Sequence, residues 1–434
     1  MPTILLILPT GTYRAEEYLA AAHRLGVEVV TGSERPQALA STMAEHFVEL
    51  PLDDPPRAAA VIAEHGSRIH LDAILAVDDE GLLAAAMAAE SLGLDSSPVA
   101  AVALTRDKAA MRAALAAAGV PQPDYEVVRG SPPDGGEPGN PDEVAEAAVR
   151  LGFPVVVKPT SLSGSRGVIR ADSAAEARAA AERIFKILAA AREPNGSALL
   201  VERFVPGPEV ALEGVMSGGG LDVLTIFDKP DPLDGPYFEE TFYLSPSHLS
   251  PALQGEITGA TRRAVSAMGL TEGPVHVELR VPGAGGASSG QPVAVLEVAA
   301  RTIGGRCSKA LVLANGWSLE ELVIARLVGL EAPPTELAGP AGVLMIPIPS
   351  SGKLASVAGI SDARGLPHVT GVEITVPLGR RVRALPEGDR YLGFVFAAAP
   401  ERDLVEAALR SALELLVVEI EPEPGHGVGR PPVR

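Results

Sequence analysis

The segment FPVVVKPTSLSGSRGV, residues 153–168, places a lysine at the end of an apolar run and follows it with a loop of small residues. Val155–Lys158 is typical of a buried strand, and a second strand is expected over Gly167–Arg170. Glycine and serine let backbone N–H groups approach phosphate oxygens, and Lys158 adds a positive charge. The Gly-Lys-Ser/Thr order of a Walker A loop is absent, and no helix follows at once. The segment indicates a phosphate-binding loop, with a hairpin turn and a solvated lysine as the alternative.

A second segment, LLVERFVPGPEV at residues 199–210, combines an apolar strand with a proline bend. Strands are expected over Leu199–Phe204 and Val210–Val215, on either side of Pro206-Gly207-Pro208. Such a bend would expose the backbone groups of residues 203–205, which suit the edge of an adenine ring. The Glu209 carboxylate would then accept ribose hydroxyls. Taken alone, the segment is more simply a turn that carries two exposed acids, Glu202 and Glu209.

Two further strands, expected over Val275–Arg280 and Val293–Val298, carry acidic residues and are joined by a loop at residues 282–291. Because side chains alternate along a strand, each strand presents one polar face. These faces hold His276, Glu278 and Arg280 in the first strand, and Glu297, Ala299 and Arg301 at the end of the second. If the strands pair, two carboxylates converge beside an arginine, which suits Mg²⁺ and an anionic transition state. A cross-strand salt bridge between Glu and Arg is the alternative. Gly304 and Gly305 follow directly and invite close approach of a ligand or of another backbone.

The first hundred residues alternate strand and helix signals, which favours a parallel sheet. Strands are expected at Ile4–Leu8, Val27–Val30 and Ala73–Val77, and helices at Arg14–Leu25 and Gly81–Leu92, with Gly26 and Gly93 as helix stops. Ligands bind at the carboxyl ends of such strands, so Gly11 and the loop 78–80 are candidates, although ordinary turn chemistry explains both equally well. Thr105 is the expected N-cap of the next helix, which contains Lys108 and ends at Gly119.

Stretches rich in proline and glycine divide the chain at residues 129–141 and 331–341. They predict an N-terminal domain over 1–104, a central domain over 105–330 with a mobile lid at about 142–206, a C-terminal domain over 331–422 and a disordered tail over 423–434. A helix is expected at Ala174–Ala191 in the lid. The C-terminal domain is expected to hold strands at Val343–Ile348 and Val372–Val376 and a helix at Leu404–Leu415.

Composition narrows the class of protein. A length of 434 residues favours three domains at about 150 residues each. With 36 basic and 55 acidic residues the net charge is −19, which disfavours a nucleic-acid or anionic-membrane binder. The single cysteine, Cys307, rules out an internal disulfide or a cysteine metal cluster, and it is expected to be structural. No apolar run approaches the roughly 18–20 residues of a membrane span, and the short run at Ile4–Leu8 does not have the pattern of a signal peptide. A soluble, cytoplasmic protein is expected.

The order of these motifs, rather than any one of them, resembles the ATP-grasp superfamily over about residues 3–420. The loop 78–80 together with Thr105–Lys108 is similar to that family's junction between its N-terminal and nucleotide domains. Gly352-Lys353-Leu354 with Tyr391-Leu392-Gly393 is similar to the closing domain of its amino-acid ligase branch. The strand motifs at 276–278 and 297–301 resemble the L-amino-acid ligases of the alanine–anticapsin ligase type. The resemblance implies an α/β and α+β architecture, with a Rossmann-like N-terminal domain, a central ATP-grasp domain and an α+β C-terminal domain.

The resemblance also implies roles for individual residues. Phosphates of ATP are assigned to Lys108 and Lys158, and the mobile loop over them to Ser161, Ser163, Gly164, Ser165 and Gly167. Adenine is assigned to Glu202, Phe204 and Val205, and ribose to Glu209. Mg²⁺, with Mn²⁺ as the alternative, is assigned to Glu278 and Glu297. Arg301 is expected to contact an acyl phosphate, and His276, Gly304 and Gly305 to line the substrate pocket; Arg301, His276 and Lys158 are the expected catalytic residues.

Two departures from the family pattern stand out. Most of the superfamily has Asn two residues after the second metal-binding glutamate, where this chain has Ala299, a form that also occurs in the alanine–anticapsin subgroup. That subgroup carries Trp at the position of Gly305, so a roomier substrate pocket is expected here.

The expected activity is an ATP-dependent ligase that joins a carboxylate, an amino acid in the first instance, to an amine or a second amino acid through an acyl phosphate. The expected partners are therefore small molecules, and similar enzymes suggest a homodimer. Three alternatives stay open: a purine-biosynthetic or biotin-dependent carboxylase of the same superfamily, a non-catalytic ATP-binding protein, and a dinucleotide-binding oxidoreductase. The last is disfavoured because the turn after Leu8 lacks G-x-G-x-x-G.

Overall fold

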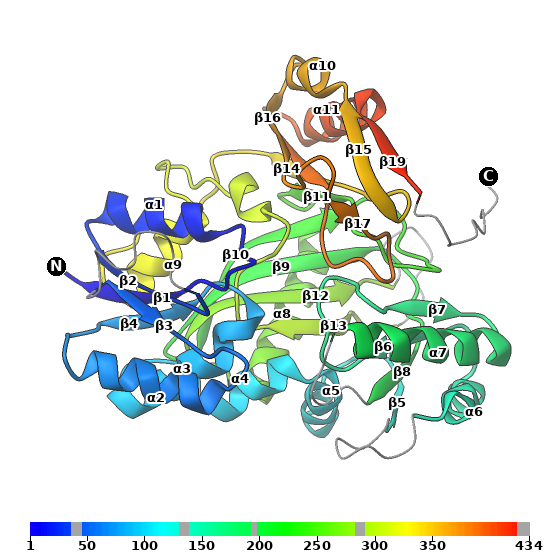
Figure 1. Ribbon diagram of the computed structural model, residues 1–434, viewed down its shortest axis with the longest axis horizontal. Helices are drawn as coiled ribbons and strands as arrows, with labels where there is room; N and C mark the ends of the chain where they lie inside the picture. Colours follow the sequence, from blue (N-terminus) through cyan, green and yellow to red (C-terminus); the bar gives the residue numbers. More distant parts are fainter. Residues whose placement is uncertain (36–45, 130–138, 192–197, 283–290, 423–434) are drawn as a thin grey trace.

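The computed structural model describes residues 1–35, 46–129, 139–191, 198–282 and 291–422. The predicted disordered tail and most of the loop 282–291 lie outside these ranges. Figure 1 shows the N-terminal unit at the left, a small lid sheet at the lower right and the C-terminal elements at the top. In the described part of the chain, no helix is long and apolar enough to cross a membrane.

The N-terminal unit has the predicted parallel sheet, in the order β3-β2-β1-β4. The apolar residues of β1 are buried on both faces of the sheet, one side in a core with α1 and the other in a core with α2 and α3. Gly26 and Gly93 end their helices in the left-handed conformation, as predicted. The elements are β1 (Thr3–Ile7), α1 (Ala15–Leu25), β2 (Glu28–Ser33), β3 (Phe47–Glu49), α2 (Pro55–Gly66), β4 (Ala73–Ala76), the 3₁₀ turn η2 (Asp79–Gly81), α3 (Leu82–Leu92) and α4 (Val99–Arg106).

The predicted N-cap at Thr105 is wrong. Thr105 lies in the last turn of α4, where its hydroxyl donates to the carbonyl of Val102. Helix α5 (Lys108–Ala117) is capped instead by Asp107, whose carboxylate accepts from two N–H groups of the first turn. An aspartate satisfies these otherwise unpaired donors at least as well as a threonine does. The chain thus changes direction between α4 and α5, and Lys108 begins a new helix.

The lid is a four-stranded antiparallel sheet in the order β5-β8-β6-β7, covered on one face by α6 and α7. The helix predicted at Ala174–Ala191 is confirmed residue for residue. The strand expected at Gly167–Arg170 begins later, at Ile169, because Gly167 has a positive φ of 73° and turns the chain. The elements are β5 (Tyr125–Val128), α6 (Pro141–Leu151), β6 (Val155–Pro159), β7 (Ile169–Ala171), α7 (Ala174–Ala191) and β8 (Leu199–Arg203).

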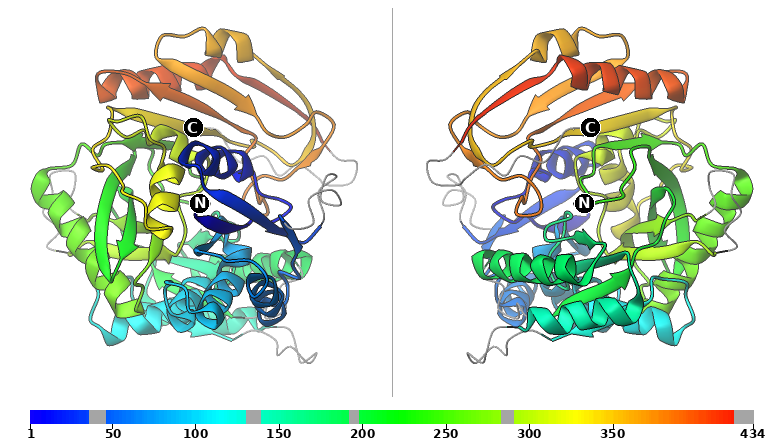
Figure 2. Two further views of the ribbon diagram at one scale, coloured as in Figure 1. Left: turned by 90° about the vertical axis from the view of Figure 1, so that its left-hand side faces the viewer. Right: turned by 90° about the vertical axis from the view of Figure 1, so that its right-hand side faces the viewer.

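A sheet of eight strands forms the centre, in the order β13-β12-β9-β10-β11-β14-β18-β16. It runs across the predicted domain boundary at residue 331, because β14 pairs with β11 and joins the C-terminal strands to the central ones. In both views of Figure 2 the C-terminal elements lie above this sheet. The elements are β9 (Glu209–Ser217), β10 (Gly220–Lys229), β11 (Phe242–Ser245), α8 (Pro251–Met268), β12 (Gly273–Arg280), β13 (Ala294–Ala299), the 3₁₀ turn η3 (Cys307–Ala310), α9 (Leu319–Leu327), β14 (Ala341–Ile346), β16 (Val369–Ile374) and β18 (Gly393–Ala398).

A smaller three-stranded sheet, in the order β17-β15-β19, packs with two helices on the C-terminal end of the large sheet. The loop between β17 and β18 returns toward the lid, where the N–H of Gly167 donates to the carbonyl of Pro386. The elements are β15 (Gly352–Ala358), α10 (Ile360–Arg364), β17 (Arg381–Val382), α11 (Arg402–Leu415) and β19 (Val417–Glu421).

Candidate active site

A cavity of about 600 Å³ lies where the N-terminal unit, the lid, the central sheet and the β17–β18 loop meet. Most of the predicted site residues line it: Lys108, Lys158, Ser163, Gly164, Ser165, Glu202, Phe204, Val205, Glu209, His276, Glu278, Glu297, Arg301, Gly304 and Gly305. Ser161 and Gly167 are not among the lining residues. The structure therefore brings together residues that are nearly 200 positions apart in the sequence.

The acidic hairpin forms as predicted. β12 and β13 are antiparallel, with Glu278 directly opposite Glu297 and His276 opposite Ala299. The apolar residues that alternate with these are buried in the core between β12 and α8. The polar face of each strand therefore forms one wall of the cavity, and the alanine at 299 offers no ligand atom to it.

Each of the two expected metal-binding carboxylates contacts a lysine. Glu297 lies 3.1 Å from the ammonium of Lys108, which also donates to the carbonyl of Leu162 in the small-residue loop. Glu278 lies 3.2 Å from the ammonium of Lys229. Two facing carboxylates that already hold cations have the charge and the oxygen donors that Mg²⁺ prefers, so these residues fit the expected ion.

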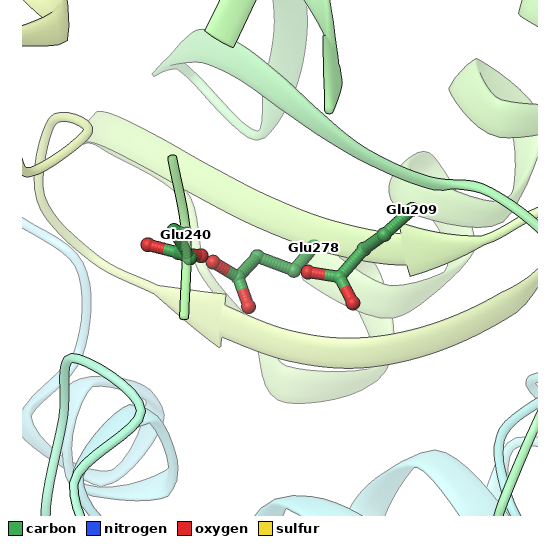
Figure 3. Close-up of side chains that lie close together, drawn as sticks. All are labelled: Glu209, Glu240 and Glu278. Carbon is green, nitrogen blue, oxygen red and sulfur yellow. The ribbon is translucent and has the colours of Figure 1, made fainter. Parts of the chain in front are cut away.

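Lys229 is a site residue that the sequence interpretation missed. Its ammonium lies 2.6 Å from Glu209 and 2.6 Å from Glu240, in addition to its contact with Glu278. Figure 3 shows the three glutamates pointing toward one another from β9, β12 and the loop before β11. Burial disfavours the ammonium, but the three carboxylates outweigh it and raise the pKa of Lys229. The signal was present, because DVLTIFDK at residues 222–229 repeats the apolar run ending in lysine that singled out Lys158.

Lys158 and Glu202 lie against each other on neighbouring lid strands. The Lys158 ammonium is 2.8 Å from the Glu202 carboxylate, whose other oxygen accepts from Nε of Arg112 at 2.6 Å. Burial lowers the pKa of Lys158. Burial alone would raise the pKa of Glu202, but the charges of Arg112 and Lys158 lower it. An adenine contact by Glu202, which stays a prediction, would compete with these two ion pairs.

The backbone of the predicted adenine segment is partly engaged. The N–H groups of Arg203 and Phe204 donate to the carbonyls of Asp124 and Pro154, so the expectation that they are free for an adenine edge is wrong. Among the described residues, no partner holds the N–H of Val205. The Phe204 ring is stacked at 6.5 Å on the ring of Phe238. Phe204 and Val205 thus keep the position expected of them, with one free backbone donor.

Arg301 and His276 are held by buried carboxylates. Arg301 contacts Asp79, its Nε lying 3.1 Å from the carboxylate. His276 shares a hydrogen bond of 3.1 Å with Glu213, which also accepts the N–H of Ile303. Burial opposes the imidazolium, yet the hydrogen bonds to Glu213 and Glu278 outweigh it and raise the pKa of His276.

The space beside Gly305 is already filled, contrary to the roomier pocket expected there. A Cβ at this position would lie 2.5 Å from Sδ of Met345, and the φ of 61° disfavours any other residue. The N–H of Gly305 donates to the hydroxyl of Tyr13 at 2.7 Å. Met345 therefore borders the pocket where a side chain at 305 would. Cys307, next to this loop, is buried as expected, and burial raises the pKa of its thiol well above the usual value.

Comparison with known proteins agrees with this geometry. An ATP-grasp N-terminal domain model matches residues 19–95, an ATP-grasp domain model residues 151–310, and an L-amino acid ligase C-terminal domain 2 model residues 344–421. Alanine–anticapsin ligase of Bacillus subtilis is 26% identical over 49% of this chain and 45% of its own length. D-Alanine–D-alanine ligase of a Synechococcus strain is 32% identical over 52% of this chain and 64% of its own length. The chain thus spans about half to two thirds of these two relatives.

Among solved structures, an L-amino acid ligase from Bacillus licheniformis superposes with a TM-score of 0.76 at 24% identity, over 97% of this chain and 99% of that one. The shared fold therefore extends over the whole described chain. The three domain matches follow one another in the order that this fold requires. The chain belongs to the ATP-grasp superfamily of carboxylate–amine ligases, with a C-terminal domain of the L-amino acid ligase type.

Proposed function

We propose that the chain is an ADP-forming ligase that activates the carboxylate of an amino acid with ATP and joins it to an amine. The observation that carries this proposal is the gathering of Lys108, Lys158, Glu278, Glu297 and Arg301 around one cavity, from the N-terminal junction, the lid and the central sheet. Such a set of cations and facing carboxylates suits a nucleotide triphosphate beside a second anion.

In the proposed reaction, a carboxylate oxygen of the donor attacks the terminal phosphorus of ATP, and ADP leaves with the electron pair of the broken P–O bond. The amine nitrogen of the acceptor then attacks the acyl carbon, inorganic phosphate leaves, and the nitrogen loses a proton. Lys108 and Lys158 offset phosphate charge, and Arg301 faces the acyl phosphate. Glu278 and Glu297 would hold Mg²⁺, which supplies further charge neutralisation to the phosphates. No side-chain nucleophile is needed, in keeping with the buried Cys307.

An amino acid as donor is supported by one corner of the cavity. The carboxylate of Glu240 accepts the hydroxyls of Tyr243 at 2.7 Å and Tyr391 at 3.1 Å and faces the cavity. Next to it, the ring of Tyr391 lies 6.0 Å from that of Phe394, which adjoins the pocket wall at Met345. A negative group beside an apolar wall suits a molecule with both an ammonium and an apolar side chain.

The test is release of ADP and phosphate from Mg-ATP across a matrix of amino-acid pairs, with mass spectrometry of the products. A pair that stimulates release and yields the condensed mass supports the proposal. Release that depends on bicarbonate, with a carboxylated product, would replace it by a carboxylase. ATP binding without release for any pair or for bicarbonate would favour a binding protein. Lys353→Ala, which removes an exposed lysine on β15 outside the cavity, is the control for Lys158→Ala.

A further inference from the structure

The N-terminal unit reaches into the cavity through Asp79, in the 3₁₀ turn that follows β4. One carboxylate oxygen lies 3.1 Å from Nε of Arg301, and the other accepts from Nη2 of the same guanidinium at 3.2 Å. A carboxylate that contacts two nitrogens of one guanidinium fixes both its position and the tilt of its plane. The Asp79 side chain is only 13% exposed, so water competes little for this contact.

The contact leaves part of the guanidinium free. Nη1 of Arg301 donates to the carbonyl of Thr302 at 3.0 Å. A guanidinium has five N–H donors, so those that Asp79 and Thr302 do not take remain for a ligand in the cavity. Burial alone would raise the pKa of Asp79, but the charges of Arg301 and Arg106 lower it, so the carboxylate stays ionised beside the arginine.

The backbone that carries Arg301 is tied to the same unit. Arg14, buried at the end of the turn after β1, donates to the carbonyls of Thr302 and Ile303 as well as to that of Val77. Val77 directly precedes the loop that contains Asp79. One rigid piece of the N-terminal unit therefore holds both the side chain of Arg301 and the main chain that follows it.

We infer that Asp79 is a positioning residue, which orients the Arg301 guanidinium toward the acyl phosphate and so makes the N-terminal unit part of the reaction centre. This inference rests on the proposed function. It predicts that loss of the Asp79 charge acts through Arg301 and not by itself. A misplacement of about 1 Å in a group that contacts the reacting atoms costs on the order of 100-fold in rate.

The test is a double-mutant cycle on the full chain, with ADP release as the readout. Asp79→Asn keeps the size of the side chain and removes the charge. It should lower kcat by about 10- to 100-fold while the KM for ATP changes by less than about 3-fold. In an Arg301→Ala background, Asp79→Asn should have no further effect, because its target is gone. Asp79→Glu, which restores the charge, should recover part of kcat.

Glu64→Gln is the matched control, because it removes an exposed ion pair with Arg68 in the same N-terminal unit. It should leave kcat within about 2-fold of the parent. Effects of Asp79→Asn and Arg301→Ala that multiply would overturn the inference, as would an Asp79→Asn variant with unchanged kcat. ADP release reports the cycle whatever the product is. Mass spectrometry of the parent's products separates failure of the ligase proposal from failure of this one.

Discussion

Replacement of Glu202 by glutamine should destabilise the lid rather than weaken adenine binding. Glu202 is 3% exposed, and its two oxygens accept from Arg112 at 2.6 Å and contact Lys158 at 2.8 Å. It is thus one anion between two cations in the lid–centre contact. A glutamine of the same size would leave both cations buried without a full counter-charge.

The magnitude follows from the burial. Removing one partner of a buried ion pair costs about 3–5 kcal/mol, because the remaining charge stays desolvated. Arg112 keeps hydrogen bonds to the carbonyls of Val295 and Leu296, which lowers the cost of leaving it behind. Lys158 can lose its proton, since burial already lowers its pKa. We therefore expect a loss near the lower end, about 3 kcal/mol at pH 7.

Urea unfolding followed by circular dichroism measures this loss as a lower midpoint at an unchanged slope. The control is Glu126→Gln on β5 of the same sheet, where an exposed pair with Arg150 should contribute under about 1 kcal/mol. A Glu202→Gln variant with the parental midpoint and a raised KM for ATP would refute the reasoning and return Glu202 to the adenine site.

The acid dependence of the same difference gives an independent check. Because the folded-state pKa of Glu202 is lowered, its stabilisation is complete above the unfolded value of about 4.3 and is lost as the pH falls toward the folded value. The gap between the parental and Glu202→Gln midpoints should therefore be constant from pH 7 to about pH 5 and shrink below about pH 4. A gap that widens on acidification would contradict the assignment.

Three other substitutions test the cavity. Lys158→Ala should abolish ADP release yet keep the urea midpoint close to the parental one, because Arg112 still pairs with Glu202; full activity would remove Lys158 from the site. Glu297→Gln should abolish Mg-ATP turnover, whereas ATP affinity in the presence of a chelator should not fall, as equilibrium dialysis would show; normal turnover would contradict its role. Met345→Ala should extend the accepted amino acids to larger side chains, because a buried methionine borders the pocket; an unchanged substrate profile would place the donor elsewhere.

Local patterns predicted much of the fold and of the cavity wall. Alternation along β12 and β13 was sufficient to place His276, Glu278 and Glu297 on one face, because a strand has a fixed period of two. The run before Lys158 marked a buried strand by its β-branched composition. The helix at Ala174–Ala191 followed from its amphipathic spacing and its length.

Contacts between distant segments were not predictable in the same way. Asp79 and Arg112 each looked like an ordinary turn or helix residue, and their partners lie 222 and 90 positions away. No local period encodes which cation an acid will meet after folding. The pairing of β14 with β11, which carries the sheet past residue 331, is equally non-local, since the proline-rich stretch before it suggested a separation. Lys229 is different, because its pattern was visible and the segment was passed over.

The pairing of each expected metal-binding carboxylate with a lysine bears on how a nucleotide would enter. Glu297 contacts Lys108, and Glu278 contacts Lys229, so the empty cavity is already close to charge balance at these points. Under the proposed function, both ammonium groups would exchange a carboxylate for phosphate oxygens while the carboxylates turn to the metal ion. Each exchange conserves the local charge, so no step leaves a buried ion unpaired, which is the costly alternative. On this account, loss of Glu297 frees Lys108 for phosphate and spares metal-free ATP binding, whereas it removes the group that the metal needs for turnover.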